Sequence, residues 1–175
     1  MPELDTSWYA MKGPKLDSMA CREKLYVLLS LFFASPRIAE HCDDEVGCPF
    51  RQMLDEHEEG LITRLLIETA VLIRMKDDLF EQQHGIPADA NKDIVGNLWL
   101  PATASQSEPL HLREACNKVV HAKLINFDVR LEPHCWHSRH LNPTVYIHGT
   151  NQRGIEWKAE VDITKWVSFG YTMFP

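Results

Sequence analysis

The chain has 175 residues, of which 45% are hydrophobic and 25% are charged, and its 18 basic and 25 acidic residues give a formal net charge of −7. This length fits one domain with a core of its own, and the composition is that of an ordinary globular protein. The acidic balance disfavours a large electrostatic surface for nucleic acid, because it repels phosphates on average, but it is compatible with a local basic groove.

No stretch of the sequence predicts a membrane segment or an export signal. The longest apolar run covers residues 25–34, whereas a membrane-spanning helix needs about 20 such residues. The N-terminus lacks the basic region and early apolar stretch of a signal peptide. The five cysteines are irregularly spaced and imply no disulfide framework. We therefore expect a cytoplasmic protein without a membrane partner.

The first predicted element is a helix over about residues 17–34. Its apolar residues recur at helical spacing, which indicates a helix with one buried face. Asp17 or Ser18 is the expected N-cap, because short polar side chains accept hydrogen bonds from the first free amides of a helix. Pro36 is expected to end the helix soon afterwards.

A second, longer helix is predicted in the middle of the chain. Residues 36–58 are mostly polar and predict a loop followed by a short helix over Phe50–Glu58. The long helix then runs from about Glu59 to Gln83, and Gly85 and Pro87 end it. Its wide apolar stripe predicts that it is the spine of the core.

A third helix is predicted after a long connection. Residues 85–107 contain prolines, serines and threonines and are interpreted as that connection. The helix is expected to begin near Ser107, with Glu108 and Pro109 in its first turn, because acidic residues and proline favour a helix start. It is expected to run to about His121.

The apolar period then changes from helical spacing to alternation, which is typical of strands with one buried face. The alternating segments are residues 124–131, 143–148 and 155–163. Residues 149–154 are expected to connect the last two strands as a hairpin. Residues 164–171 predict a short final helix.

These elements predict an α+β fold in a single domain that covers residues 1–175. An N-terminal helical bundle over about 17–121 would be followed by a small antiparallel β-meander over about 124–163 and by a short C-terminal helix. Helices grouped before strands, rather than alternating with them, are typical of this class.

Three polar residues, Arg113, Asn117 and His121, lie four apart and therefore share one stripe of the third predicted helix. Arginine can hold a phosphate through two parallel hydrogen bonds, and histidine can exchange a proton near neutral pH. Together they could deprotonate a ribose 2′-hydroxyl and stabilise charge on phosphorus without a metal. We assign Arg113 as phosphate clamp, Asn117 as orienting residue and His121 as proton-transfer residue.

The segment Asn117-Lys118-Val119-Val120-His121 resembles the signature of the HEPN superfamily of small helical domains. That signature is an arginine, usually followed directly by a polar residue such as asparagine, and a histidine several residues later. The preceding helix is also similar to the second helix of these domains, with Glu68, Arg74, Asp77 and Asp78. The resemblance covers mainly residues 60–121.

This resemblance implies a HEPN-like protein that binds RNA or a nucleotide, or a metal-independent endoribonuclease, in a toxin–antitoxin or antiviral defence system. It also implies a homodimer, in which the motif helices of two protomers form one composite site. No cofactor is expected.

Two alternatives depend on the same helix. The usual position of the motif's arginine holds Cys116, and Arg113 lies one turn earlier. This departure favours a non-catalytic interaction protein on the same scaffold, of the immunity or antitoxin type, with a protein partner. In the second alternative there is no site at all: Arg113 pairs with a carboxylate, Asn117 packs or caps locally, and His121 interacts with the helix dipole.

A metal site is not expected. Residues 134–140 hold three histidines and Cys135, but their spacing matches no closed four-ligand zinc site. We interpret the segment as a loop between strands, with a zinc-binding module as its alternative. Asp77 and Asp78 are expected to be surface carboxylates rather than ligands of a divalent ion.

Overall fold

The computed structural model of the chain describes residues 16–42, 47–85, 92–132 and 135–174. The helices are α2 (Ser18–Ala39), α3 (Pro49–Met53), the π-helical segment η1 (Leu54–Glu58), α4 (Glu59–His84), α5 (Leu112–Val120) and α6 (Ile163–Thr172). The strands are β1 (Ile94–Trp99), β2 (Glu108–His111), β3 (Leu124–Glu132), β4 (Cys135–Thr150) and β5 (Glu156–Asp162). The α+β class is thereby confirmed.

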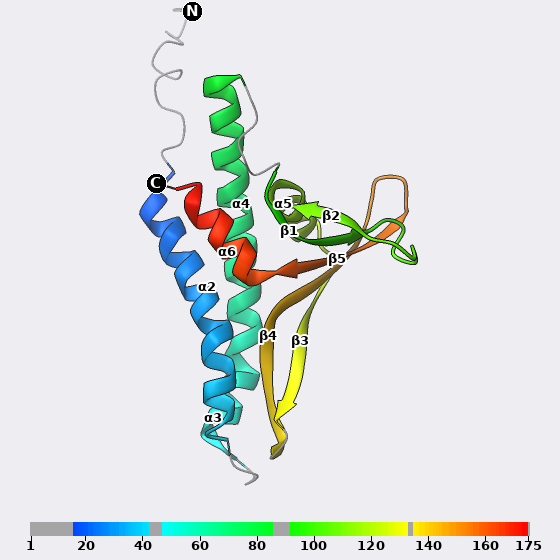
Figure 1. The fold of residues 1–175 in the computed structure, drawn as a ribbon. Helices are drawn as coiled ribbons and strands as arrows, with labels where there is room; N and C mark the ends of the chain where they lie inside the picture. Colours follow the sequence, from blue (N-terminus) through cyan, green and yellow to red (C-terminus); the bar gives the residue numbers. More distant parts are fainter. Residues whose placement is uncertain (1–15, 43–46, 86–91, 133–134, 175) are drawn as a thin grey trace, which may run out of the picture.

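The five strands form one antiparallel sheet in the order β2-β1-β5-β4-β3. The helices α2, α4 and α6 stand together on one side of this sheet, and α5 lies between α4 and the part of the sheet that carries β1 and β2 (Figure 1). One core of buried side chains joins the two layers. Within the described ranges, no helix has both the length and the apolar character of a membrane crossing.

The predicted start of α2 is confirmed, but its predicted end is wrong. Asp17 caps the helix, because its Oδ1 accepts a hydrogen bond of 3.0 Å from the Ala20 amide. Pro36, expected to stop the helix, lies inside it. The last turn is held by hydrogen bonds beyond the proline, and Ala39 is buried in a small second cluster of apolar residues. Burial of this turn offsets the cost of an interior proline.

The long helix α4 is confirmed as the spine of the structure. It contacts both α2 and α5, so it lies at the centre of the helical layer (Figure 1). Gly85 ends it in the left-handed conformation, with a φ of 69°, as glycine after a helix commonly does. The short helical stretch predicted before it is also present, as α3 and η1.

Two strands occur where the sequence predicted a connection and the start of the third helix. β1 lies within the supposed connection, and β2 occupies the supposed first turn of the helix, so α5 begins only at Leu112. β1 depends on a partner distant in sequence, since it pairs with β5, and β2 in turn pairs with β1. Pro109 is tolerated because β2 is an edge strand. Strand pairing therefore overrides the local signals for a helix start.

The predicted meander and the final helix are confirmed, with changed bounds. β3, β4 and β5 pair in sequence order, but β4 is much longer than the alternating segment 143–148. In the hairpin between β4 and β5, the Asn151 side chain accepts hydrogen bonds from the amides of Arg153 and Ile155. Asp162 caps α6 by accepting from the Thr164 amide at 2.9 Å.

The pairing of β1 with β5 requires a residue without a side chain at position 96. A Cβ built on Gly96 would lie 1.8 Å from the backbone oxygen of Glu160. Gly60 in α4 is the opposite case, because a Cβ there would meet nothing within 4 Å.

We expect Gly96→Ala to lower the free energy of unfolding by roughly 1–3 kcal/mol, as overpacking in a core does. Gly60→Ala is the matched control and should be neutral or stabilising by up to about 1 kcal/mol, since alanine favours a helix interior over glycine. Denaturant unfolding of the two variants measures both effects. A Gly96→Ala protein as stable as the wild type would contradict the β1–β5 register.

Candidate functional site

On helix α5, the residues of the predicted motif point in different directions. Its apolar side, made by Leu112, Ala115, Cys116 and Val119, is buried in the core. The helix is anchored at its start, where the Leu112 amide donates to the Asp93 oxygen at 2.8 Å. The remaining sides face α4 and the hairpin between β4 and β5. The three predicted site residues are therefore not all brought to one place.

Arg113 faces α4 and is engaged there by two carboxylates. Its Nη2 donates to Asp78 Oδ1 at 2.5 Å, and its Nη1 donates to Asp77 Oδ2. A weaker contact of 3.4 Å joins Nη1 to the Arg74 carbonyl. The carboxylate pairing considered for Arg113 from the sequence is confirmed, so its guanidinium is already occupied in this structure.

Asp77 was expected at the surface, and that expectation is wrong. Asp77 is 1% exposed, whereas the neighbouring Asp78 side chain is 46% exposed. Burial raises the pKa of Asp77, and the Arg113 cation only partly opposes this rise. The signal was present in the sequence, because Asp77 continues the buried stripe of Leu66, Ala70 and Ile73 at helical spacing.

Asn117 and His121 line a hollow of about 360 Å³ between the end of α5 and the hairpin that joins β4 to β5. The other residues of this α5 hollow are Lys118, Thr150, Asn151, Gln152 and Trp157. Two of the three predicted site residues are thus brought together. The hairpin residues lie beside Asn117 and His121 only because β4 and β5 pair in the sheet. Local sequence signals could therefore not predict that they line the hollow.

Trp157 forms an apolar wall of the α5 hollow and is only 2% exposed. Its indole packs where Gly149 has no side chain, since a Cβ there would lie 2.2 Å from the ring. On the other side, Lys118 Nζ lies 4.7 Å from the ring centroid, a cation–π distance. The indole therefore helps to fix the position of the lysine.

Lys118 lines the α5 hollow, and the sequence interpretation did not include it among the candidate site residues. Its Nζ lies 3.0 Å from the carboxylate of Glu114, one turn earlier on α5. A second ammonium group stands at the rim, where Lys123 Nζ donates to Thr150 Oγ1 at 2.7 Å. The spacing of Glu114 and Lys118 is the only local signal for this placement.

The α5 hollow combines three amide side chains, a hydroxyl, an imidazole and an ammonium group against an aromatic wall. No carboxylate is among the described residues that line it. Amides donate and accept hydrogen bonds, and an ammonium group binds phosphate as a point charge. These groups suit a small anionic ligand that also has hydrogen-bonding edges.

Cys116 points away from the α5 hollow. It is 0% exposed, and burial raises the pKa of its thiol well above the usual range. The chain position where the HEPN motif usually has its arginine therefore lies in the apolar core here. A charged side chain at this position would lose its hydration on burial.

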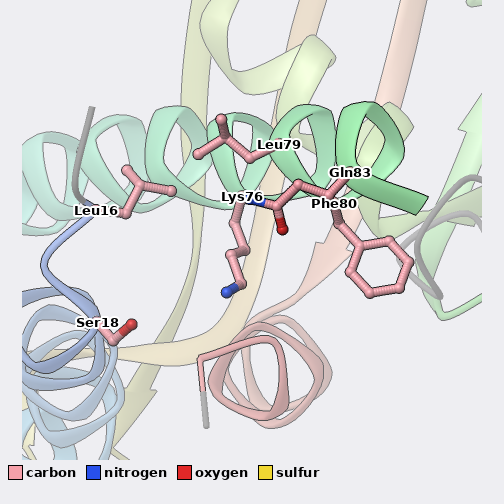
Figure 2. Close-up of a pocket in the computed structure, with 6 residues that line it drawn as sticks. All are labelled: Leu16, Ser18, Lys76, Leu79, Phe80 and Gln83. Carbon is pink, nitrogen blue, oxygen red and sulfur yellow. The ribbon is translucent and has the colours of Figure 1, made fainter. Parts of the chain in front are cut away.

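A second, smaller hollow lies between the start of α2 and the last turns of α4 (Figure 2). Its volume is about 150 Å³, and Lys76 extends into it from α4, beside Phe80 and Gln83 (Figure 2). It contains one cation and no histidine among its described lining residues. This hollow therefore offers less chemistry than the α5 hollow.

Across the described ranges, no group of three or more His, Cys, Asp or Glu residues could hold a metal ion. The zinc alternative at residues 134–140 falls mainly outside the residues whose side chains the structure describes. Of that segment, Arg139 contacts Asp55 at 3.0 Å and Glu59 at 3.7 Å.

Comparisons of the chain with protein-family models, with curated proteins and with solved structures find no match. The arrangement of the α5 hollow is accordingly the main basis for a functional proposal.

Removal of the Arg113 cation should destabilise the protein. We expect Arg113→Ala to cost about 3–5 kcal/mol of unfolding free energy, because it leaves a buried carboxylate without its partner. Arg37→Ala is the matched control, since Arg37 pairs with Glu40 at an exposed site, and such pairs contribute at most about 1 kcal/mol. Denaturant unfolding at neutral pH measures both values.

The loss of unfolding free energy in Arg113→Ala should also depend on pH. Without the cation, the folded-state pKa of Asp77 rises further above its unfolded value, so the variant gains relative stability as pH falls and loses it as pH rises. The difference in unfolding free energy between Arg113→Ala and the wild type should therefore become smaller at acidic pH. A gap that widens on acidification would show that Asp77 is not the group left unpaired.

Proposed function

We propose that this chain is a HEPN-like RNA-binding protein whose α5 hollow holds one nucleotide and its phosphate, with a metal-independent endoribonuclease-type reaction at His121. The supporting observation is that Asn117, Lys118 and His121 line one hollow that has an indole wall and no carboxylate among its described lining residues. Its volume of about 360 Å³ falls within the range of small-ligand sites.

The roles of the residues follow from their surroundings. Lys118 takes the part of phosphate cation that the sequence assigned to Arg113, because Lys118 lines the hollow and Arg113 does not. Lys118 pairs with one carboxylate, the partly exposed Glu114, whereas Arg113 is held by two carboxylates of α4, of which Asp77 is buried. Asn117 and Gln152 supply amide groups that can pair with a base or ribose edge. Arg113 is then a positioning residue, which fixes α5 on α4 and thereby aims Asn117 and His121 outward.

The proposed reaction needs one proton acceptor beside the phosphate. The His121 imidazole takes the proton of the ribose 2′-hydroxyl, the O2′–P bond forms and the P–O5′ bond breaks. A water molecule protonates the departing 5′-oxygen, and the products are a 2′,3′-cyclic phosphate and a free 5′-hydroxyl. Lys118 stabilises the charge that develops on the phosphoryl oxygens. In the homodimer implied by the HEPN resemblance, a second α5 would face the first and complete the site.

The non-catalytic interaction protein is the second candidate. The observation that favours it is the commitment of Arg113 to Asp77 and Asp78, which leaves the motif without a free arginine. In that case the α5 surface would bind RNA or a protein partner without cleaving it.

The two candidates differ in what His121→Ala changes. In the enzyme, this variant should lower the rate of RNA cleavage at least about 100-fold, the usual contribution of a general base, while RNA affinity falls much less. Lys118→Ala should weaken RNA binding and reduce its salt dependence by about one counterion. Fluorescence anisotropy with labelled single-stranded RNA and gel-based cleavage assays measure these effects.

Matched controls come from two residues of α4 that do not line the α5 hollow. Lys76→Ala removes the lysine of the smaller hollow, and His84→Ala removes an exposed histidine at the end of α4. Both should leave binding and cleavage unchanged. Binding without cleavage by the wild type would reject the enzyme and leave the non-catalytic candidate, and absence of RNA binding would reject the proposal.

A further inference from the structure

The face of α2 that points away from the core carries three large apolar side chains. Met19, Tyr26 and Phe33 are 71%, 70% and 57% exposed, respectively. They are seven residues apart and therefore lie along one line of the helix, opposite the buried stripe that holds Leu25 and Leu28. This seven-residue spacing is that of a seam at which one helix packs against another. We call these three residues the α2 stripe.

The rest of the described chain does not cover the α2 stripe. α4 and α6 pack against other sides of α2, which forms an outer edge of the helical layer (Figure 1). Ser30, which lies between Tyr26 and Phe33, donates its hydroxyl hydrogen to the Tyr26 carbonyl at 2.8 Å. The polar group within the seam is therefore already bonded inside its own helix.

Two opposite charges flank the α2 stripe on the same side. Glu23 is exposed near the start of the helix, and Arg37 is exposed near its end. If two α2 helices pack antiparallel around a two-fold axis close to Ser30, Tyr26 of each copy lies level with Phe33 of the other. The same register brings Glu23 of each copy level with Arg37 of the other, and a two-fold axis keeps both residues on one side of the seam.

We propose that the α2 stripe binds the α2 stripe of a second copy of this chain, antiparallel, to form a symmetric homodimer. A second copy fits this face because one register brings the apolar residues of one α2 opposite those of the other, and brings Glu23 of each copy opposite Arg37 of the other. Arg37 contacts Glu40 within its own helix at 2.9 Å, but so exposed a pair contributes little and can be shared with Glu23 of the second copy.

This dimer differs from the composite-site dimer that the HEPN resemblance implies, and it does not rest on the proposed function. α2 and α5 lie on opposite sides of α4 (Figure 1), so a dimer through the α2 stripe leaves both α5 hollows open. A helix of 22 residues is about 33 Å long. The contact is therefore small, and we expect a dissociation constant on the order of micromolar.

Charge reversal tests this register directly. Sedimentation equilibrium of the full chain over a wide concentration range should show a monomer–dimer equilibrium. Glu23→Arg and Arg37→Glu should each weaken dimerisation at least about tenfold, because like charges then face each other. The double variant Glu23→Arg/Arg37→Glu restores opposite charges and should recover the wild-type affinity. Tyr26→Ser should also weaken the dimer.

Glu108→Arg is the control, because it reverses an exposed charge on β2, away from α2. It should leave dimerisation unchanged, and circular dichroism should show that all variants keep the fold. A monomeric wild type would overturn the proposal. So would a wild-type dimer that the single reversals leave unaffected, or a double variant as weak as the single ones.

Discussion

The ion pair between Arg113 and the carboxylates of Asp77 and Asp78 is the interaction on which the arrangement of α5 depends. Asp77 is almost fully buried, so without the guanidinium its charge would face an apolar core. The pair joins α5 to α4 and, together with the buried apolar side of α5, fixes the rotation of α5 about its own axis. With that rotation, Cys116 enters the core, while Asn117, Lys118 and His121 face the hairpin between β4 and β5. One buried charge pair therefore decides which residues can meet a ligand.

The sheet supplies the other half of the site. β5 lies between β1 and β4, so the hairpin that follows β4 is held at the end of α5. Gly149 leaves room for the Trp157 indole, and the indole in turn contacts Lys118. A cation is thus held against an aromatic wall in a protein whose net charge is −7.

Local sequence signals predicted the elements whose pattern lies within the element itself. They failed for a strand whose pairing partner is distant in sequence. The Asp17 cap, the Gly85 terminus and the alternating strands β3 and β5 could be predicted because each depends on nearby residues or on one repeated period. β1 could not, because one of its two partner strands lies about 60 positions later and Gly96 interrupts its pattern. The predicted stripe lies on α5 and its C-cap His121, but only Asn117 and His121 line the hollow. Which of its members faces the hollow depends on Asp77, whose burial reflects how α4 packs.

In the function that we propose, the α5 hollow binds a nucleotide through Lys118 and His121. The most direct measurement is an NMR titration of isotope-labelled protein with a ribonucleoside 3′-monophosphate, which needs no assumption about catalysis. We expect saturable chemical-shift changes that cluster at Asn117, Lys118, His121 and residues 150–152. Shifts confined to the hollow around Lys76, or no saturable shifts at all, would contradict it.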